Sequence, residues 1–478
     1  MWLFLSNRRF SQGCSFVCDW DNVPHRVAMS VPAKLPQRRI LGLIFLTVLM
    51  DIIGFSVIIP LFPHLLSHYI TSEGATGTLI GSLSAAAEWL GGDTVFKKTV
   101  LFGGLLSTLY SLLQFVFSPI WGALSDRFGR RGILTITLAG SALSYVLWIF
   151  AAQFWVVVLT RLVCGMMAGN IAVASAAAAD VTEEKERTKG MAVVGIAIGM
   201  GFLVGPVIGG LTAPDEVGTA VATSAFGLNP FSLPAAVSAF MATMNFVLVW
   251  AFFPETLPLK NRALAHARKP SIFDLATVGS SEVRRTSLAN LIYQVAFTGM
   301  ENTVVFLTLA LFAYSPRDNV ALFIFNGACL IFAQGMARQL VKGLGQKKVA
   351  MLGMSLAIIA FMVIAFIPPP TTPATLDSWD KPIFYLGMGL ISFATGLILP
   401  SLSSLVSLYS GPSEQGRNLG ILRSAGSLAR VIGPLTAAFL YFQTGTHFWV
   451  YIFGASLMVP ALWVIQRLPE PVIHRHNS

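Results

Sequence analysis

The chain alternates long apolar stretches with short polar segments, and this alternation dominates its pattern. Crossing a hydrocarbon core about 30 Å thick takes about 20 helical residues, and twelve of the stretches reach that length. The pattern therefore predicts an all-α membrane protein with twelve transmembrane helices. The predicted spans are residues 40–64, 102–121, 133–152, 154–176, 190–212, 232–253, 287–312, 319–338, 347–367, 382–408, 418–440 and 446–466.

One further apolar segment, residues 78–90, ends near two acids, Glu88 and Asp93. Its length of about a dozen residues is too short to span the bilayer. Counting it as a crossing would also move every later basic loop to the opposite side of the membrane. We therefore interpret it as a helix at the extracellular surface or at the membrane interface.

Composition and charge agree with a membrane protein. Hydrophobic residues make up 55% and charged residues 11% of the 478 residues, and the mean hydropathy is +0.70. A soluble domain of this length is far less apolar. The net charge of +10 does not indicate nucleic-acid binding, because the chain lacks the water-facing basic surface that phosphate contacts require. Most of the 32 Lys and Arg residues instead lie in the tail and in alternate loops, which predicts that both termini are cytoplasmic.

Weak internal repetition divides the chain into two halves. Three short matches recur between them: Asp51 with Glu301, Gly129-Arg130-Arg131 with Gly345-Gln346-Lys347, and Gly205-Pro206 with Gly433-Pro434. Such a repeat predicts two pseudo-symmetric six-helix bundles. The predicted parts are a disordered cytoplasmic tail (1–39), the first bundle (40–253), a cytoplasmic linker (254–286), the second bundle (287–466) and a cytoplasmic tail (467–478).

The sequence supports neither an enzyme nor a cofactor protein. Cys14 and Cys18 in the tail lack the second ligand pair that a metal site needs, so no metal is predicted. No nucleotide-binding loop, nucleophile elbow or dinucleotide fingerprint occurs, which leaves ATP-driven pumping and enzymatic chemistry without support. We predict no cofactor.

Two glycine-rich strings stand out. The first places one acid and three arginines in a short loop between spans, where they pair with helix ends or with a neighbouring loop; the alternative is an ordinary loop of surface charges. Its residues are Gly122, Asp126, Arg127, Gly129, Arg130 and Arg131. The second string puts small residues on one stripe of the fifth span, which lets another helix come close. Its residues are Gly195, Gly199, Gly205, Pro206 and Gly209, with Gly433 and Pro434 as the second-half counterpart.

Five charged residues lie inside the predicted spans and away from their ends: Asp51, Arg161, Glu301, Arg423 and Arg430. Each costs a few kcal/mol at the bilayer centre, so each is expected to face a cavity and to have a partner. Asp51 and Arg161 lie at similar depths along their helices, and we expect them to meet. The same count brings Glu301 and Arg430 together, which gives one pair in each half.

These groups are the candidates for function. A buried carboxyl group that loses its partner binds a proton, so Glu301 and Asp51 are candidate proton carriers; the alternative is that both are static partners that hold helices together. Arg423 and Arg430 are candidates for binding an anionic substrate, against a role in helix packing. Softer candidates for the cavity wall are Asn170, Gln114, Tyr293 and Gln294.

The strings resemble those of a known family. The first is similar to the signature loop of the major facilitator superfamily, and the second to the fifth-helix motif of its drug:proton antiporters. Asp51-x2-Gly54-x5-Pro60-x2-Pro63 resembles the first helix of the tetracycline exporters, and the phrases around Glu301 and Arg423 resemble their tetracycline-transporter-like relatives in animals. The resemblance implies the major facilitator fold and organic anions as substrates.

The resemblance also implies roles for particular residues. Asp126 is expected to lie at the start of the eleventh helix, and Arg130 to pair with Asp180 at the end of the fourth, which forms a latch closed in the outward-facing state. Arg161 is expected to modulate the proton site. The second-half copy departs from the family pattern, because Arg338 and Lys342 stand where the first half has Gly122 and Asp126. The latch is therefore expected in the first half alone.

Together these observations predict a secondary active transporter. It exports small amphipathic organic compounds, organic anions or drug-like molecules, in exchange for protons by alternating access, and it works as a monomer in the lipid bilayer of the plasma membrane or of an endomembrane. A symporter or facilitator of a metabolite is the first alternative, and a transport-inactive scaffold the second. The fifth-helix motif favours export, and the acids inside the spans favour transport, because a scaffold would gain nothing from them.

Overall fold

The computed structural model describes residues 37–73, 77–182, 187–214, 227–257, 280–368, 379–410 and 415–470. Over these ranges the chain is helical, without a β-strand. They include 12 helices that are long and apolar enough to cross a membrane, which confirms the predicted fold class. Residues 1–36, 258–279 and 471–478 lie outside the described part of the chain, so the predicted tails and most of the linker stay predictions.

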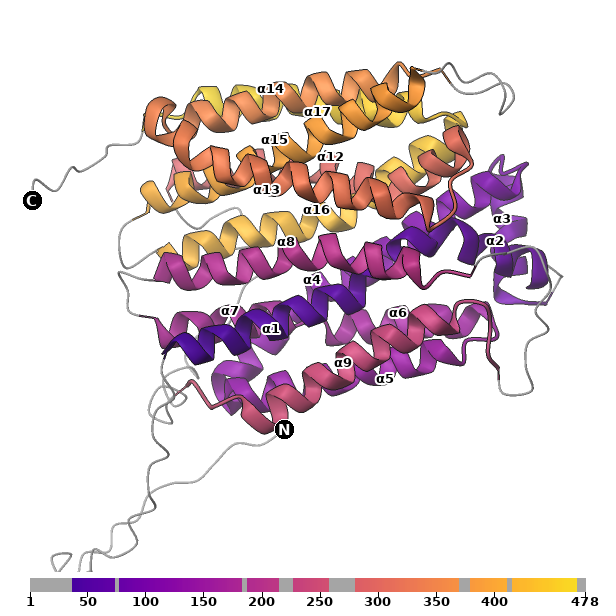
Figure 1. The fold of residues 1–478 in the computed structure, drawn as a ribbon, viewed down its shortest axis with the longest axis horizontal. Helices are drawn as coiled ribbons and strands as arrows, with labels where there is room; N and C mark the ends of the chain where they lie inside the picture. Colours follow the sequence, from indigo (N-terminus) through magenta and orange to yellow (C-terminus); the bar gives the residue numbers. More distant parts are fainter. Residues whose placement is uncertain are drawn as a thin grey trace, which may run out of the picture. The chain divides into compact units, whose positions relative to one another are not determined.

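Antiparallel helices make up the bundle (Figure 1). The first half consists of α1 (Gln37–Ser56), η2 (Ile59–Leu61), α2 (Phe62–Glu73), α3 (Leu79–Trp89), α4 (Val95–Phe128), α5 (Arg130–Ile149), α6 (Phe154–Met167), α7 (Asn170–Val181), α8 (Arg187–Leu211) and α9 (Ser232–Phe252). The second half consists of α12 (Ser281–Phe312), α13 (Asp318–Leu344), α14 (Gln346–Ala365), α15 (Asp380–Leu408), α16 (Gln415–Thr444) and α17 (His447–Gln466).

Several helices extend beyond the apolar runs that predict them. α4 begins at Val95, where the Thr94 side chain caps it by accepting a hydrogen bond from the Lys97 N–H at 3.3 Å. α4 continues to Phe128. Most of the segment that we expected to be a charged loop therefore forms the last two turns of α4. Gly129 alone separates α4 from α5, with φ of 103°, a conformation that glycine adopts without strain.

The first and fourth spans are broken helices. Pro60 and Pro63 mark the break between α1 and α2, because proline has no N–H to continue a helical ladder. α6 and α7 are separated at Ala168 and Gly169, where a Cβ on the glycine would lie 2.5 Å from Trp121. The Trp121 indole N–H donates to the Met166 carbonyl at 2.6 Å, which satisfies a backbone group near the break.

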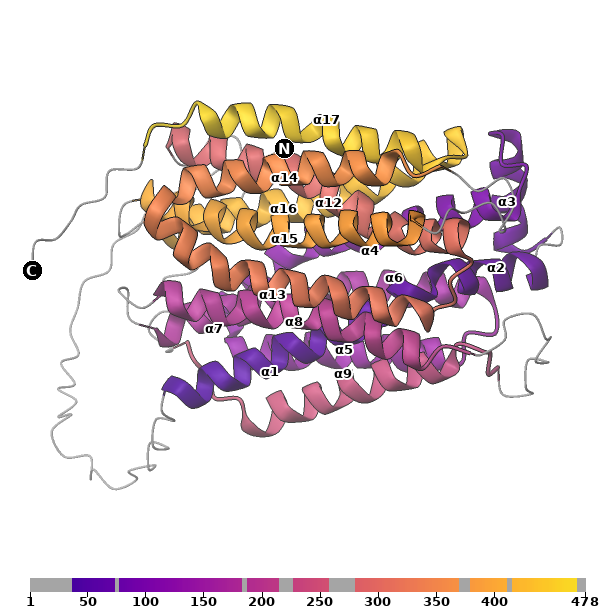
Figure 2. The same cartoon turned by 45° about the horizontal axis from the view of Figure 1, so that its top comes forward.

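The two halves repeat one another in structure. Figures 1 and 2 show the early helices, in indigo to magenta, on one side of the bundle, and the late ones, in orange to yellow, on the other. The Arg131 guanidinium donates to the Trp250 carbonyl near the end of α9 at 2.5 Å. Lys347, the equivalent cation, donates to the Leu468 carbonyl just after α17 at 2.7 Å. Each half thus uses a cation at the start of its third helix to satisfy a carbonyl at the end of its sixth.

α3 lies apart from the spans, at the end of the bundle that we call the α3 end (Figure 2). It is an 11-residue helix, consistent with the prediction that this segment does not cross the membrane. Lys98 of α4 forms an ion pair with Glu88 at 2.5 Å and so holds α3 beside the start of α4. The side chain of Trp89 is 87% exposed.

Glycines on α8 let it pack directly on α1, but only part of the predicted stripe takes part. A Cβ on Gly205 would collide with Ser56, and one on Gly209 with the Val57 carbonyl, so both positions require glycine. Gly433 of α16 likewise packs against the backbone of α12. Gly195 and Gly199 have no atom within 4 Å of a Cβ, so their predicted packing role is wrong in this conformation.

This difference predicts opposite outcomes for two substitutions on α8. Gly209→Ala places a methyl group against backbone and should cost about 1–3 kcal/mol, as overpacking does. Gly199→Ala, in open space, should be neutral or gain up to about 1 kcal/mol of helix propensity. The melting temperatures of the two variants, measured by gel filtration after heating in detergent, check this. Equal melting temperatures would show that Gly209 is not at a tight contact.

Candidate functional site

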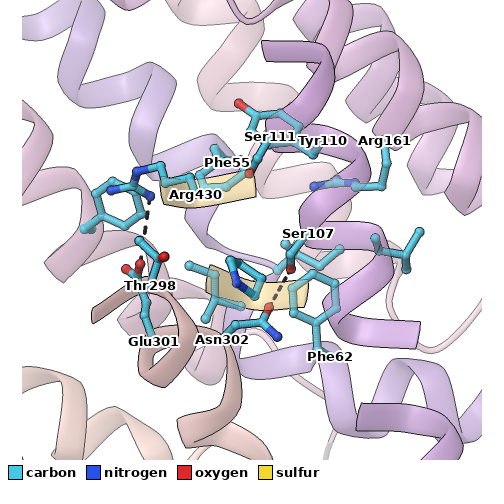
Figure 3. Close-up of a pocket in the computed structure, with 15 residues that line it drawn as sticks. Phe55, Phe62, Ser107, Tyr110, Ser111, Arg161, Thr298, Glu301, Asn302 and Arg430 are labelled. Atoms are coloured by element: carbon cyan, nitrogen blue, oxygen red, sulfur yellow. Dashed lines mark hydrogen bonds and ion pairs between the residues drawn. The ribbon is translucent and has the colours of Figure 1, made fainter. Parts of the chain in front are cut away.

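A cavity lies between the two halves, near the middle of the spans (Figure 3). Side chains from α1, η2, α2, α4, α6 and α8 of the first half line it, together with side chains from α12 and α16 of the second. Its polar lining residues are Ser107, Ser111, Arg161, Thr298, Glu301, Asn302 and Arg430, besides the tyrosine Tyr110. Because both halves contribute, any relative motion of the halves changes this cavity.

Glu301 and Arg430 meet in the cavity, which confirms the expected pair of the second half. Their Oε2 and Nη1 atoms lie 3.8 Å apart, a distance that fits an ion pair but is too long for a good hydrogen bond. The Arg430 guanidinium also lies 4.7 Å from the centre of the Phe202 ring on α8. The arginine therefore contacts an acid of its own half and an aromatic ring of the other half.

The backbones of α12 and α16 come close beside this pair. A Cβ on Gly299 would lie 3.0 Å from the Gly433 carbonyl, and the Thr298 hydroxyl donates to the Ala429 carbonyl at 3.2 Å. Small residues on both helices thus allow the two backbones to approach closely. This close contact sets the separation of the backbones that carry Glu301 and Arg430.

Arg161 faces the cavity from the first half (Figure 3). It is only 2% exposed, and its Nε and Nη2 atoms have no hydrogen-bond partner among the described residues. Its guanidinium lies 5.3 Å from the centre of the Trp148 ring. Buried guanidinium nitrogens without acceptors are costly, so Nε and Nη2 of Arg161 are hydrogen-bond donors that a ligand could satisfy.

The expected ion pair between Asp51 and Arg161 is therefore wrong in this structure. Asp51 Oδ1 instead accepts a hydrogen bond from Asn170 Nδ2 at 2.8 Å. The break in the fourth span explains the difference, because Asn170 begins α7 just after the break, while Arg161 belongs to α6 before it. Asp51 and Asn170 are not among the residues that line the cavity.

The other predicted binding residues also lie elsewhere. Arg423 donates from Nη1 to the Ser175 hydroxyl of α7 at 2.6 Å, which links the two halves outside the cavity lining. Tyr293 donates to Thr395 at 2.7 Å and so holds α12 to α15. Gln114 and Gln294 are half-buried without lining the cavity. Of the predicted substrate residues, Arg430 alone is a cavity residue.

The charged string after the second span forms a compact cluster, which we call the latch cluster: Asp126, Arg130, Asp180 and Glu255. Arg130 pairs with Asp126 at 2.6 Å and with Asp180 at 2.9 Å, which confirms the expected contact with the end of the fourth span. Arg127 instead lies over the Phe128 ring.

Glu255 is the member of this cluster that the sequence analysis missed. Its Oε1 accepts the Arg130 N–H at 2.9 Å, so a carboxylate caps the first residue of α5, where the helix dipole favours negative charge. The signal was an acid directly after the sixth span. The expected contact of Asp126 with the eleventh helix requires side chains 411–417, which lie outside the described residues. The gating role of the cluster stays a prediction.

Comparison with known proteins agrees with this architecture. A model of the Major Facilitator Superfamily matches residues 44–390. A mouse protein, Major facilitator superfamily domain-containing protein 10, is 30% identical over 466 residues, covering 92% of this chain and 95% of its own. Tetracycline resistance protein, class E, of Escherichia coli is 30% identical over 441 residues, covering 90% of this chain and 96% of its own. The crystal structure of the human organic anion transporter MFSD10 (TETRAN) matches with a TM-score of 0.70 and 29% identity, covering 91% of this chain and 100% of that one.

These matches confirm the resemblance that the two glycine-rich strings indicate, including its link to tetracycline exporters. The family and the structural neighbours are transporters rather than enzymes. The fold, with 12 long apolar helices among the described residues, makes the protein an integral, multi-pass component of the lipid bilayer that moves small molecules. The chain therefore belongs to the major facilitator superfamily.

Proposed function

We propose that this transporter exports small organic anions in exchange for protons, and that Arg430 is shared between Glu301 and the substrate. The observation that carries the proposal is the composition of the central cavity. It holds two arginines, Arg161 and Arg430, and a single acid, Glu301. With one charge balanced, the cavity keeps a net positive charge that suits a monovalent anion.

The donors are arranged for a ligand that accepts hydrogen bonds. Arg161 has two nitrogen atoms, Nε and Nη2, without a hydrogen-bond partner among the described residues, and Arg430 is held by a 3.8 Å ion pair and by its contact with the Phe202 ring. Charge-assisted bonds from guanidinium to carboxylate or sulfonate are strong and directional, so an anion between the two arginines gains from both. Aromatic side chains complete the wall and suit an apolar substrate body: Phe55, Phe62, Tyr110 and Phe202.

Exchange of partners at Arg430 couples the anion to a proton. The Glu301–Arg430 pair can be opened in two alternative ways. An anion opens it by taking Arg430, and Glu301 then stays charged, because Arg161 and Arg430 together balance the two negative charges. After the anion has left, a proton opens the pair by neutralising Glu301. If the carrier changes sides only while the pair is open, the anion crosses in one direction and the proton in the other, which is exchange. Arg161 then acts as a substrate anchor, and Asp51, bonded to Asn170 outside the cavity, has a secondary role.

The relatives support the direction and the substrate class. One is titled an organic anion transporter, which suits the proposed substrate class, and another a tetracycline resistance protein, which suits export. We propose that the transporter works as a monomer. The bias of basic loops favours cytoplasmic termini, in the plasma membrane or an endomembrane.

Flux in proteoliposomes tests the proposal. The probe is 1-naphthalenesulfonate, a fluorescent anion that stays charged at every working pH, with neutral 1-naphthalenesulfonamide as the matched control. An acidic lumen should drive accumulation of the sulfonate above equilibrium and leave the sulfonamide at equilibrium. Accumulation driven by the opposite gradient would show a symporter. Absence of protein-dependent flux under both gradients would contradict transport of organic anions.

Glu301→Gln should separate exchange from coupling. The amide mimics the protonated acid, so the variant should still exchange labelled for unlabelled 1-naphthalenesulfonate but lose accumulation driven by the pH gradient. Asp51→Asn should show a partial form of the same loss. Normal accumulation by the glutamine variant would make Glu301 a structural residue and would move the proton site elsewhere.

Arg161→Gln should weaken anion binding. Loss of a charge-assisted bond is worth about 1.5–3 kcal/mol, so the KM for 1-naphthalenesulfonate should rise about tenfold or more. Arg161→Lys should recover part of the affinity, and Arg127→Gln, at an exposed arginine, is the control. An unchanged KM with a reduced maximum rate would assign Arg161 to conformational change rather than to substrate.

A further inference from the structure

The first half of α4 fills the groove between α12 and α16 of the other half. A Cβ on Gly103 would lie 2.7 Å from Phe306 of α12, and one on Gly104 would lie 3.0 Å from the Pro434 carbonyl of α16. Two adjacent glycines thus bring α4 against both walls of the groove at once. This contact lies on the α3 side of the cavity, because both glycines precede Leu106, the first α4 residue that lines the cavity.

One turn further along α4 the same two-sided contact becomes polar. Ser107 Oγ donates to Asn302 Oδ1 at 2.6 Å, as Figure 3 shows, and Thr108 Oγ1 donates to the Val431 carbonyl at 3.3 Å. These are hydrogen bonds between the halves, and they come from consecutive residues. Because residues four apart share a helix face, Ser107 follows Gly103 on the α12 side and Thr108 follows Gly104 on the α16 side.

The two acceptor residues are sequence neighbours of the ion pair. Asn302 directly follows Glu301, and Val431 directly follows Arg430. α4 therefore forms a hydrogen bond with the residue after Glu301 on α12 and with the residue after Arg430 on α16. A shift of α12 or α16 that accompanies separation of the ion pair moves these acceptors as well, because neighbouring residues of a helix move together.

We propose that Ser107 and Thr108 are positioning residues that couple the Glu301–Arg430 ion pair to closure of the cavity at the α3 end. The proposal rests on the proposed function in one respect, namely that this ion pair opens and closes during transport. Hydrogen bonds depend steeply on distance and angle, whereas the apolar contacts of Gly103 and Gly104 change gradually. The two hydroxyls thus make closure sensitive to the state of the pair.

A distance measurement on the intact protein tests this coupling without any substrate. Spin labels are placed at Gln153 of the first half and Trp379 of the second, both exposed at the α3 end, in a chain whose native cysteines are replaced. The distance distribution gives the ratio of closed to open molecules. Glu301→Gln removes the charge of the acid, and Ser107→Ala with Thr108→Val removes both hydroxyls while keeping the side-chain volumes similar.

The four combinations form a double-mutant cycle. Either change alone should lower the closed-to-open ratio about tenfold, as expected for loss of an ion pair or of two neutral hydrogen bonds. If the proposal holds, Glu301→Gln changes the ratio less than about threefold once the hydroxyls are absent. Ser107→Thr and Thr108→Ser, which keep the hydroxyls, should restore the full effect of Glu301→Gln.

Ser111→Ala is the matched control, because Ser111 lies one turn further on α4 and lines the same cavity. Its effect should multiply with that of Glu301→Gln. If the effects of the hydroxyl variants also multiply with Glu301→Gln, the hydroxyls are structural and the proposal is overturned. If the double-mutant cycle shows the expected coupling but proteoliposomes show no proton-driven flux, the proposed function is rejected and the coupling between the hydroxyls and the ion pair is retained.

Discussion

A charge inside a bilayer must have a partner, and this constraint organises the centre of the molecule. Each buried ion would cost a few kcal/mol if left alone. In the second half the requirement is met by the Glu301–Arg430 pair, but only at 3.8 Å. In the first half two nitrogen atoms of Arg161, Nε and Nη2, have no acceptor among the described residues. The proposed anion would supply the missing acceptors and the negative charge.

Close helix contacts make this arrangement sensitive to motion. Gly299 and Gly433 bring α12 and α16 together beside the ion pair, and Gly103 and Gly104 bring α4 into the groove that these helices form. Because these small residues leave no flexible side chains between the helices, a shift of α12 or α16 at the Glu301–Arg430 pair is transmitted directly to the contact with α4. The described contacts of the latch cluster, by contrast, join residues of the first half to one another and to Glu255 just after α9.

The sequence was sufficient for the spans and for one of the two ion pairs. Apolar length sets the number of crossings, and depth along a helix brought Glu301 and Arg430 together correctly. The same argument failed for Asp51 and Arg161, because depth does not give rotation about the helix axis, and the break before Asn170 changes that rotation. Spacing likewise could not separate Gly199, which is open, from Gly209, which is packed.

Other residues were missed for a different reason. Ser107 and Thr108 are small polar residues that occur in many spans, and their importance comes only from what lies across the interface. Ser175 is similar, since nothing in its own helix indicates Arg423 as its partner. Glu255 could have been found, because an acid beside a basic loop at a helix end is an unusual placement.

The central claim is that an anion on Arg430 and a proton on Glu301 open the ion pair in turn, so anion binding must release a proton from the protein. Calorimetry of 1-naphthalenesulfonate binding in two buffers with different ionisation enthalpies measures the number of protons taken up or released. The account predicts release of roughly one proton per anion from the wild type at a pH where Glu301 is protonated before binding, and none from Glu301→Gln. Proton uptake by the wild type, or equal release from both proteins, would contradict it.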